Sequence, residues 1–348
     1  MIDELRDSMN TSMSISSTLP DHSLSIVVPM HNEMDNVAPL VKRVEECLGN
    51  YPWPWELILV DDGSTDGTRE AIEQAAQQSQ GFVRLVELAR NFKQTAAMQA
   101  GIDAARADVI VTMDGDLQND PVDIPRMVAR LLNEELDLVA GWRKDRKDNM
   151  VMRKIPSQIA NALIARMTGI ALKDNGCSLK VFRASTLKRV RLYGEMHRFI
   201  PAWLSTVTPS KRIAQEVVTH HPRIHGESKY GISRTFRVLL DLFFVYFFMR
   251  YRARPGHFFG GIGLSLLGAG SLILSYLSFV KFYLGEDIGT RPLLFGGFFL
   301  VIAGVQMLTT GILAEVLVRV LFESGNSKSY LARETPMPAA NAGWHLPR

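Results

Sequence analysis

Two long stretches without a charged side chain constrain the fold of this chain more than any other feature. Residues 258–280 and 292–314 each run for 23 residues without Asp, Glu, Lys or Arg. At about 1.5 Å of rise per residue, such a helix reaches roughly 34 Å, and the apolar core of a bilayer is about 30 Å thick. Two buried helices of a soluble core are the alternative. Because only 11 residues join the stretches, we expect a membrane hairpin.

Basic residues around the hairpin predict its orientation. Because Lys and Arg accumulate on the cytoplasmic side of membrane helices, we expect both chain ends in the cytoplasm and a multi-pass protein of the inner, cytoplasmic membrane. The flanking residues are Arg250, Arg252, Arg254, Arg319 and Lys328, against Lys281 and Arg291 in the connection. Residues 233–252 contain an apolar run too short to span, with charges on one helical stripe. This pattern predicts an interfacial amphipathic helix, with a core helix as the alternative.

Upstream of the hairpin, strand and helix patterns alternate. Apolar runs rich in β-branched residues predict strands at 24–29, 56–60, 83–88, 109–113 and 136–140. Helical patterns lie between them at 37–48, 68–80, 93–105 and 121–133. Strands separated by helices of this length indicate βαβ units and a mainly parallel sheet. The fold class is therefore predicted to be α/β.

Composition narrows the class of protein. The net charge of +3 gives no argument for nucleic acid as a partner, and none is expected. Cys47 and Cys177 are the only cysteines, so no disulfide framework is possible, which suits a reducing compartment. We expect five regions: a disordered tail (1–22), the α/β domain (23–231), interfacial helices (232–254), the membrane hairpin (255–322) and a flexible tail (323–348).

The fourth predicted strand ends in two carboxylates and an amide, Asp114, Asp116 and Gln118. Side chains alternate along an extended chain, so we expect Asp114 and Asp116 to project on the same side. Ligands in open α/β sheets lie at the carboxyl ends of the strands, and Mg²⁺ or Mn²⁺ prefers such oxygen ligands and often bridges phosphates. A solvated acidic turn is the alternative interpretation of this pattern.

Three further strands end in polar residues, at 31–33, 61–62 and 141–143. Parallel strands bring these ends to one edge of the sheet, where they predict a combined nucleotide and metal site. The chain contains neither a Gly-x-Gly-x-x-Gly nor a Walker-type loop, which argues against a dinucleotide dehydrogenase or a kinase.

The motifs at 27–33, 60–68 and 114–118 resemble those of the inverting family 2 glycosyltransferases, which have a GT-A fold. Later segments resemble the polyprenyl-phosphate sugar transferases, a group that contains dolichyl-phosphate mannose synthases and bacterial undecaprenyl-phosphate enzymes. These segments are 141–143, 153–157, 174–180, 195–199 and 223–231. The resemblance covers roughly residues 24–320, and it is the combined order and spacing, not a single motif, that is specific.

The resemblance implies a role for each matching residue. The base and ribose would be surrounded by Pro29, His31, Glu33, Val60 and Asp62. Asp114 would hold the ribose side, Gly115 belongs to the same nucleotide-sugar site, and Asp116 and Gln118 would bind the metal. Phosphates would be contacted by Arg143, Arg223 and Lys229. Arg153 and Ser157, one helical turn apart, would bind the acceptor phosphate.

Three residues would carry the catalysis: Asp116, Asp174 and Arg223. Asp116, through the metal, and Arg223 would neutralise charge on the departing nucleoside diphosphate. Asp174 would act near the acceptor as a base or as an orienting group, and a structural turn before Asn175 and Gly176 is an equal alternative.

The implied function is inverting, metal-dependent transfer of a sugar from a nucleotide sugar, with a UDP-sugar expected, to the phosphate of undecaprenyl phosphate. The alternatives are a GDP-mannose-dependent mannosyltransferase and a non-catalytic membrane scaffold of the same fold. A processive polysaccharide synthase is disfavoured, because the chain lacks a Gln-x-x-Arg-Trp signature. We expect a homo-oligomer, with a tetramer as one candidate.

Overall fold

The computed structural model describes residues 19–144, 165–166, 169–194, 196–222, 246–247, 250–251 and 255–324. The chain divides into two compact units: Met1–Leu242 with Lys328–Arg348, and Phe243–Ser327. Several predictions concern residues outside the described ranges: the acceptor residues Arg153 and Ser157, the phosphate residues Arg223 and Lys229, and most of segment 233–252.

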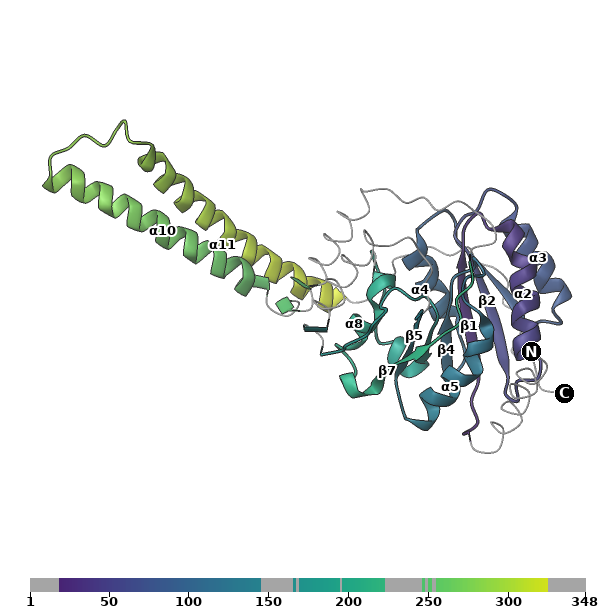
Figure 1. Cartoon of the computed structure of the whole chain (residues 1–348). Helices are drawn as coiled ribbons and strands as arrows, with labels where there is room; N and C mark the ends of the chain where they lie inside the picture. Colours follow the sequence, from purple (N-terminus) through teal and green to yellow (C-terminus); the bar gives the residue numbers. More distant parts are fainter. Residues whose placement is uncertain are drawn as a thin grey trace. The chain divides into compact units, whose positions relative to one another are not determined.

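The first unit is built on one mixed sheet of seven strands in the order β3-β2-β1-β4-β6-β5-β7 (Figure 1). Neighbouring strands are parallel except around β6, which is antiparallel to both β4 and β5. The bounds are β1 Leu24–Met30, β2 Trp55–Asp61, β3 Val83–Glu87, β4 Val109–Thr112, β5 Leu138–Trp142, β6 Lys180–Arg183 and β7 Ile213–Val217. The predicted α/β class with a mainly parallel sheet is confirmed.

Strands β6 and β7 were not predicted from the sequence. β6 is only four residues long and contains a lysine, whereas β7 carries Gln and Glu because it is an edge strand, half exposed along its length. Both therefore lack the apolar run that marks a central strand.

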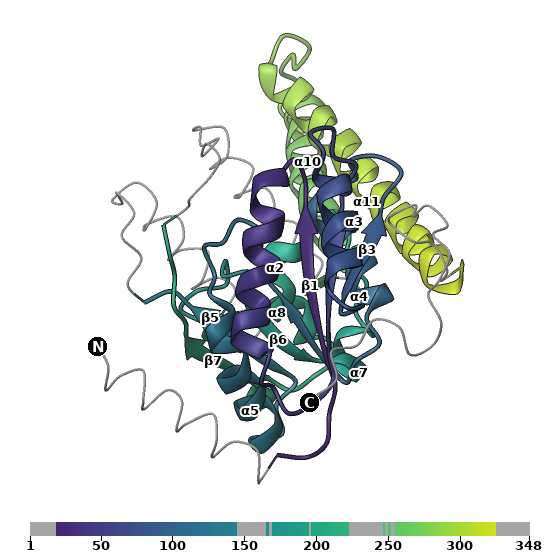
Figure 2. The same ribbon diagram turned by 90° about the vertical axis from the view of Figure 1, so that its right-hand side faces the viewer.

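Helices cover both faces of the sheet. Residues of α2 (Met34–Leu48), α3 (Thr68–Gln78) and α5 (Ile124–Asn133) join one core cluster with alternate residues of β1 and β2. Figure 2 shows α2 and α3 side by side in front of the sheet. On the opposite face, α4 (Gln94–Ala104) comes so close that a Cβ on Gly101 would lie 2.3 Å from Val27. This tight packing holds α4 close against β1 and β2.

The remaining short elements follow β6 or precede α5: η1 Pro121–Asp123, α7 Ala184–Leu187, η2 Met196–Phe199, α8 Ile200–Leu204 and η3 Ser210–Arg212. The helix predicted over 121–133 is thus divided, because it begins as a 3₁₀ turn whose N-terminal residue, Asp120, accepts a hydrogen bond from the backbone of Val122.

The second unit contains two long apolar helices, α10 (Pro255–Tyr283) and α11 (Pro292–Ser324), which lie side by side as a hairpin (Figure 1). Each is long and apolar enough to cross a membrane, and only 11 % of the most apolar stretch of each is buried. Core helices of a soluble protein would be mostly buried, so the exposure favours membrane spans over that alternative.

A row of glycines forms the contact between the two helices. Gly263 packs on Gly304, and Gly270 packs on Gly297; in both pairs an added Cβ would lie 2.9 Å from the opposite carbonyl oxygen. The glycines recur every seven residues, so they stay on one face of each helix. Small residues allow helix backbones to approach closely in lipid, where packing rather than the hydrophobic effect holds helices together.

We predict that Gly263→Leu separates the hairpin, because the new side chain would overlap backbone atoms of α11, and overpacking costs about 1–3 kcal/mol. The matched control is Gly268→Leu on the same helix, where nothing lies within 4 Å of an added Cβ. Titration with SDS, followed by energy transfer between labels on the two helices, measures the effect. Equal midpoints for the two variants would contradict the glycine contact.

Candidate active site

Hydrogen bonds join the loops that follow β1 and β2. The backbone nitrogen of Asn32 donates to Ser64 Oγ (3.0 Å), and the Asn32 Oδ1 accepts from the backbone of Thr65 (2.9 Å). The backbone nitrogen of Glu33 donates to Thr68 Oγ1 (2.8 Å). The predicted base and ribose residues of these two loops therefore belong to one rigid surface.

A third loop, after β3, completes this surface. Asp62 Oδ1 accepts from the backbone nitrogen of Phe92 (2.7 Å), and Asn91 Nδ2 lies 2.7 Å from His31 Nε2. Gly63 has a φ of +62°, and a Cβ there would lie 2.6 Å from the backbone nitrogen of Asn91. Only glycine fits this approach. Burial raises the pKa of Asp62, although the hydrogen bond from Phe92 opposes it.

The other predicted nucleotide residues on these strands are placed differently. Pro29 and Val60 are register partners at the ends of β1 and β2. The Val60 side chain is fully buried in the sheet, so only its main chain could reach a ligand. Glu33 is half-buried and accepts a hydrogen bond from Asn36 Nδ2. Among these positions, His31 is the exposed side chain.

The segment after β4 is a turn, not an extended strand. The ladder between β4 and β6 ends at the pair Thr112 and Lys180, and Leu117 adopts a left-handed φ of +59°. The prediction of an extended strand through Asp114 and Asp116 is therefore wrong, because β4 ends at Thr112 and residues 115–117 form a bend. The Asp116 carboxylate instead accepts a hydrogen bond from the backbone nitrogen of Gln118 (3.2 Å), as in an Asx turn.

The turn nevertheless brings the two carboxylates together. Burial raises the pKa of Asp114, and the negative charge of Asp116 adds to the increase. Gln94 Nε2, from the first turn of α4, donates to Asp114 Oδ1 (2.8 Å). A carboxylate whose charge is disfavoured by burial and by a neighbouring carboxylate favours a bound cation.

The donor atoms of this turn fit a hard divalent cation. Asp114, Asp116 and the Gln118 amide supply oxygen, which Mg²⁺ and Mn²⁺ prefer. Within the described ranges, no three His, Cys, Asp or Glu residues gather into a site that could hold a metal by itself. The protein thus offers part of a coordination sphere, as expected where phosphates supply the remaining ligands.

Arg143, at the end of β5, forms a two-pronged ion pair with Asp174. The distances are 2.8 Å from Nε to Oδ2 and 3.0 Å from Nη2 to Oδ1, and the backbone of Gly176 also donates to Asp174. Although burial opposes ionisation, these contacts with Arg143 outweigh it and lower the pKa of Asp174. A carboxylate with a lowered pKa is a weak base, so the geometry favours the orienting role for Asp174.

Lys180 was not singled out as a site residue by the sequence, although it lies at the centre of this edge. It is 2 % exposed, is paired with Thr112 of β4 and Ala140 of β5, and donates from Nζ to the Cys177 carbonyl oxygen. Its positive charge opposes the rise in the pKa of Asp114. The available signal was a lysine between two apolar residues, Leu179 and Val181, because buried lysines are rare unless paired.

The part of the motif at 195–199 that the structure describes, residues 196–199, contacts the first turn of α4. His197 Nδ1 is 2.6 Å from Thr95 Oγ1, and Thr95 is the residue after Gln94, which holds Asp114. Arg198 Nε donates to His197 Nε2 (3.4 Å). The sequence did not assign a role to Gln94 or Thr95, although both follow a polar loop at the end of β3, as the other site residues follow their strands.

Residues 25–191 match the family described as Glycosyl transferase family 2. The chain is 60 % identical to the dodecaprenyl-phosphate galacturonate synthase of Rhizobium johnstonii over 311 aligned residues. The alignment covers 89 % of this chain and 92 % of that relative. This chain belongs to glycosyltransferase family 2. The predicted enzyme class and the GT-A fold are therefore confirmed.

Two further proteins are less similar to this chain. An undecaprenyl-phosphate 4-deoxy-4-formamido-L-arabinose transferase of Pseudomonas fluorescens is 34 % identical over 86 % of both chains. The glucosyl-3-phosphoglycerate synthase of Mycobacterium tuberculosis, solved with Mn²⁺ and UDP-glucose, has a TM-score of 0.53 and 16 % identity, over 69 % of this chain and 82 % of that chain. At this identity, the structural likeness shows the shared fold alone.

We predict that Asp174→Asn destabilises this glycosyltransferase by about 3 kcal/mol at pH 7, because it leaves Arg143 without its counter-charge. Urea unfolding followed by tryptophan fluorescence measures the change, since all five tryptophans lie outside the hairpin unit. The control is Asp108→Asn, which changes an exposed carboxylate directly before the first residue of β4.

The effect of Asp174→Asn should also depend on pH. Because folding lowers the pKa of Asp174, its ionised form stabilises the protein above the unfolded pKa of about 3.9. This stabilisation is lost as the pH falls through the lower, folded pKa. The difference from wild type should therefore be constant from pH 8 to about pH 5 and narrow in stronger acid. A difference that grew on acidification would contradict the ion pair.

Proposed function

We propose that this glycosyltransferase transfers galacturonic acid from UDP-galacturonic acid to the phosphate of a polyprenyl phosphate, with inversion at the anomeric carbon. The observation that carries the proposal is the 60 % identity, over nearly the whole length of both chains, to a dodecaprenyl-phosphate galacturonate synthase. Relatives named for a formamido-arabinose are only 34 % identical, which supports the uronic acid over that sugar. Neither name supports the mannosyltransferase alternative.

The carboxyl edge of the sheet provides the donor site of this proposal. The joined loops after β1, β2 and β3 would hold the base and ribose through Pro29, His31, Glu33, Val60 and Asp62, and Asp114 with Gly115 would continue the surface toward the sugar. Gly115 packs so closely on Met30 that an added Cβ would lie 3.0 Å from its Cε. That contact places the main chain of Gly115 directly against the end of β1.

The residues that would hold Mg²⁺ or Mn²⁺ are Asp116 and Gln118, with Asp114 beside them. When bound, the metal would supply positive charge to the departing nucleoside diphosphate. The chain would add its own cations at the same place: Arg143, oriented by Asp174, together with Arg223 and Lys229. Positively charged groups fixed in advance stabilise charge that develops during the reaction.

The acceptor requires little activation. A phosphate monoester has its second pKa near 6, so a phosphate oxygen is already an anionic nucleophile at neutral pH. This oxygen would attack the anomeric carbon as the bond to the nucleoside diphosphate breaks, which inverts that carbon. Arg153 and Ser157 would hold the acceptor phosphate, and the α10–α11 hairpin would keep the enzyme at the cytoplasmic face of the inner membrane, where the lipid phosphate lies.

The proposal is tested with purified protein, undecaprenyl phosphate and a panel of donors: UDP-galacturonic acid, UDP-glucuronic acid, UDP-galactose and GDP-mannose. We expect mass spectrometry to detect a polyprenyl-phosphate uronate with UDP-galacturonic acid as the preferred donor. Preference for UDP-galactose or GDP-mannose would overturn the sugar assignment. The absence of a lipid product with every donor would favour the non-catalytic scaffold.

We predict that Asp116→Asn reduces transfer at least a hundredfold while leaving the fold intact, because the metal loses an anionic ligand where phosphate charge develops. Tryptophan fluorescence and the thermal midpoint serve as the folding control. Wild-type turnover by this variant, or full activity of the wild-type enzyme in excess EDTA, would exclude the metal role.

We predict that Arg153→Ala raises the KM for the lipid acceptor and leaves the KM for the donor unchanged. Loss of a hydrogen bond to a charged group costs about 1.5–3 kcal/mol, which corresponds to a change of roughly tenfold or more. Lys147→Ala, in the same basic run, is the matched control. An effect confined to the donor would move Arg153 to the nucleotide-sugar site.

A further inference from the structure

The segment that follows β7 crosses the carboxyl edge of the sheet and lies along the turn that contains Gln118. The backbone nitrogen of His221 donates to the Gln118 carbonyl oxygen (2.8 Å), and His220 forms an antiparallel bridge with Asn119. One residue earlier, the backbone nitrogen of Thr219 donates to Asp123 Oδ2 (2.6 Å). Three consecutive residues, 219–221, thus contact the chain immediately after the proposed metal ligand.

The side chain of Asp120 adds a hydrogen bond to this main-chain contact. His221 Nε2 lies 2.9 Å from Asp120 Oδ2, and Arg43 of α2 donates to both carboxylate oxygens, at 3.2 and 2.9 Å. Asp120 is only 5 % exposed. The Arg43 guanidinium places a positive charge 2.9 Å from this buried carboxylate. An ionised carboxylate can only accept hydrogen bonds, so Nε2 of His221 is the donor in its contact with Asp120.

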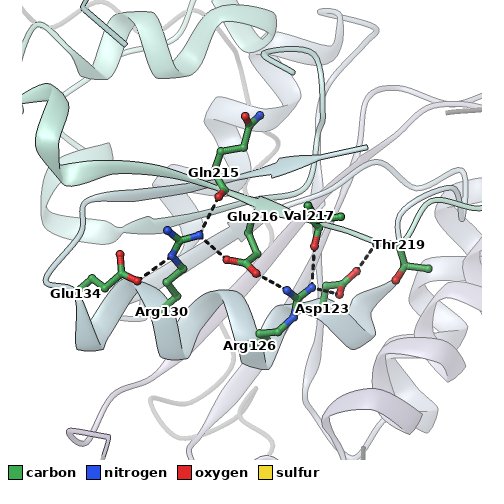
Figure 3. A network of polar contacts seen from close by, with 8 residues as sticks. All are labelled: Asp123, Arg126, Arg130, Glu134, Gln215, Glu216, Val217 and Thr219. Carbon is green, nitrogen blue, oxygen red and sulfur yellow. Dashed lines mark hydrogen bonds and ion pairs between the residues drawn. The ribbon is translucent and has the colours of Figure 1, made fainter. Parts of the chain in front are cut away.

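A separate network anchors the strand before this segment (Figure 3). Arg126 and Arg130 of α5 reach across to β7, where both contact the carboxylate of Glu216. Arg126 also donates to the Val217 carbonyl oxygen (2.8 Å) and to Asp123 Oδ1 (2.6 Å). Asp123 therefore joins the α5–β7 network to Thr219, and the segment 219–221 leaves a strand whose position is already fixed.

The turn at Gln118 needs this external support. The β4 ladder stops at Thr112, six residues earlier, and the preceding residue, Leu117, adopts a φ of +59°. A left-handed conformation is unfavourable for leucine and persists only where the surroundings hold it. The main-chain hydrogen bond from His221 to Gln118 supplies such a contact, one residue after Leu117.

We propose that residues 219–221 form a clamp that positions Gln118 for metal binding, with His221 as a positioning residue that acts through Asp120 and the Gln118 main chain. The inference rests on the proposed metal site. It adds that metal affinity depends on a contact formed by the segment that follows β7, about a hundred positions after Gln118 in the sequence. By linkage, a metal that binds the clamped state more tightly must in turn stabilise the clamp.

The experiment measures Mn²⁺ binding directly, in the presence of UDP and without turnover, by electron paramagnetic resonance of free Mn²⁺. In the full-length protein, His221→Phe removes the hydrogen bond to Asp120, and His221→Gln keeps a donor at that place. The matched control, Glu134→Gln, breaks an exposed ion pair between Arg130 of α5 and the residue just after this helix, and it does not touch segment 219–221. We expect His221→Phe to weaken Mn²⁺ binding about tenfold, and the other two variants to remain within about threefold of wild type.

Hydrogen exchange provides a second readout that a merely structural histidine would not affect. Mn²⁺ with UDP should slow amide exchange in a peptide covering 214–222 of the wild-type protein, and His221→Phe should lose this protection. Wild-type Mn²⁺ affinity in folded His221→Phe, or unchanged exchange on ligand binding, would overturn the clamp alone. Failure of the wild-type protein to bind Mn²⁺ with UDP would instead overturn the metal site and the clamp with it.

Discussion

The arrangement of this molecule depends on the electrostatic cost of placing Asp114 and Asp116 side by side at a buried edge of the sheet. Burial raises the pKa of Asp114, and the neighbouring charge of Asp116 adds to the increase, so the ionised form of Asp114 is disfavoured. The surrounding structure offsets that cost with a donor from α4 at Gln94 and a buried cation at Lys180. A divalent cation bound between these carboxylates and a diphosphate would offset the remaining negative charge.

The antiparallel strand β6 makes this offset possible. Its insertion between β4 and β5 brings Lys180 beside the Asp114 turn, and the chain just before it carries Asp174 to Arg143. A purely parallel sheet would have placed β5 directly beside β4 and left no strand to deliver these groups. The reversal of one short strand therefore determines which charged side chains lie at this edge of the sheet.

Close packing, not electrostatics, holds the hairpin together. In lipid, apolar side chains gain nothing by leaving the solvent, so close backbone contact along the glycine row holds α10 against α11. At the start of α10, Glu315 of α11 accepts a hydrogen bond from the backbone nitrogen of Gly256 (3.2 Å), which satisfies one of the free donors of the first helical turn.

The sequence by itself determined five of the seven strands, the two apolar helices and the polar strand ends, because burial and periodicity are local properties of a segment. It did not determine that the Asp114 segment turns, since that depends on where the ladder with β6 stops. The pairing of Arg143 with Asp174 and of His221 with Asp120 joins residues 31 and 101 positions apart. Only the tertiary structure decided these contacts, because strand order and register place such residues together and no local pattern encodes them.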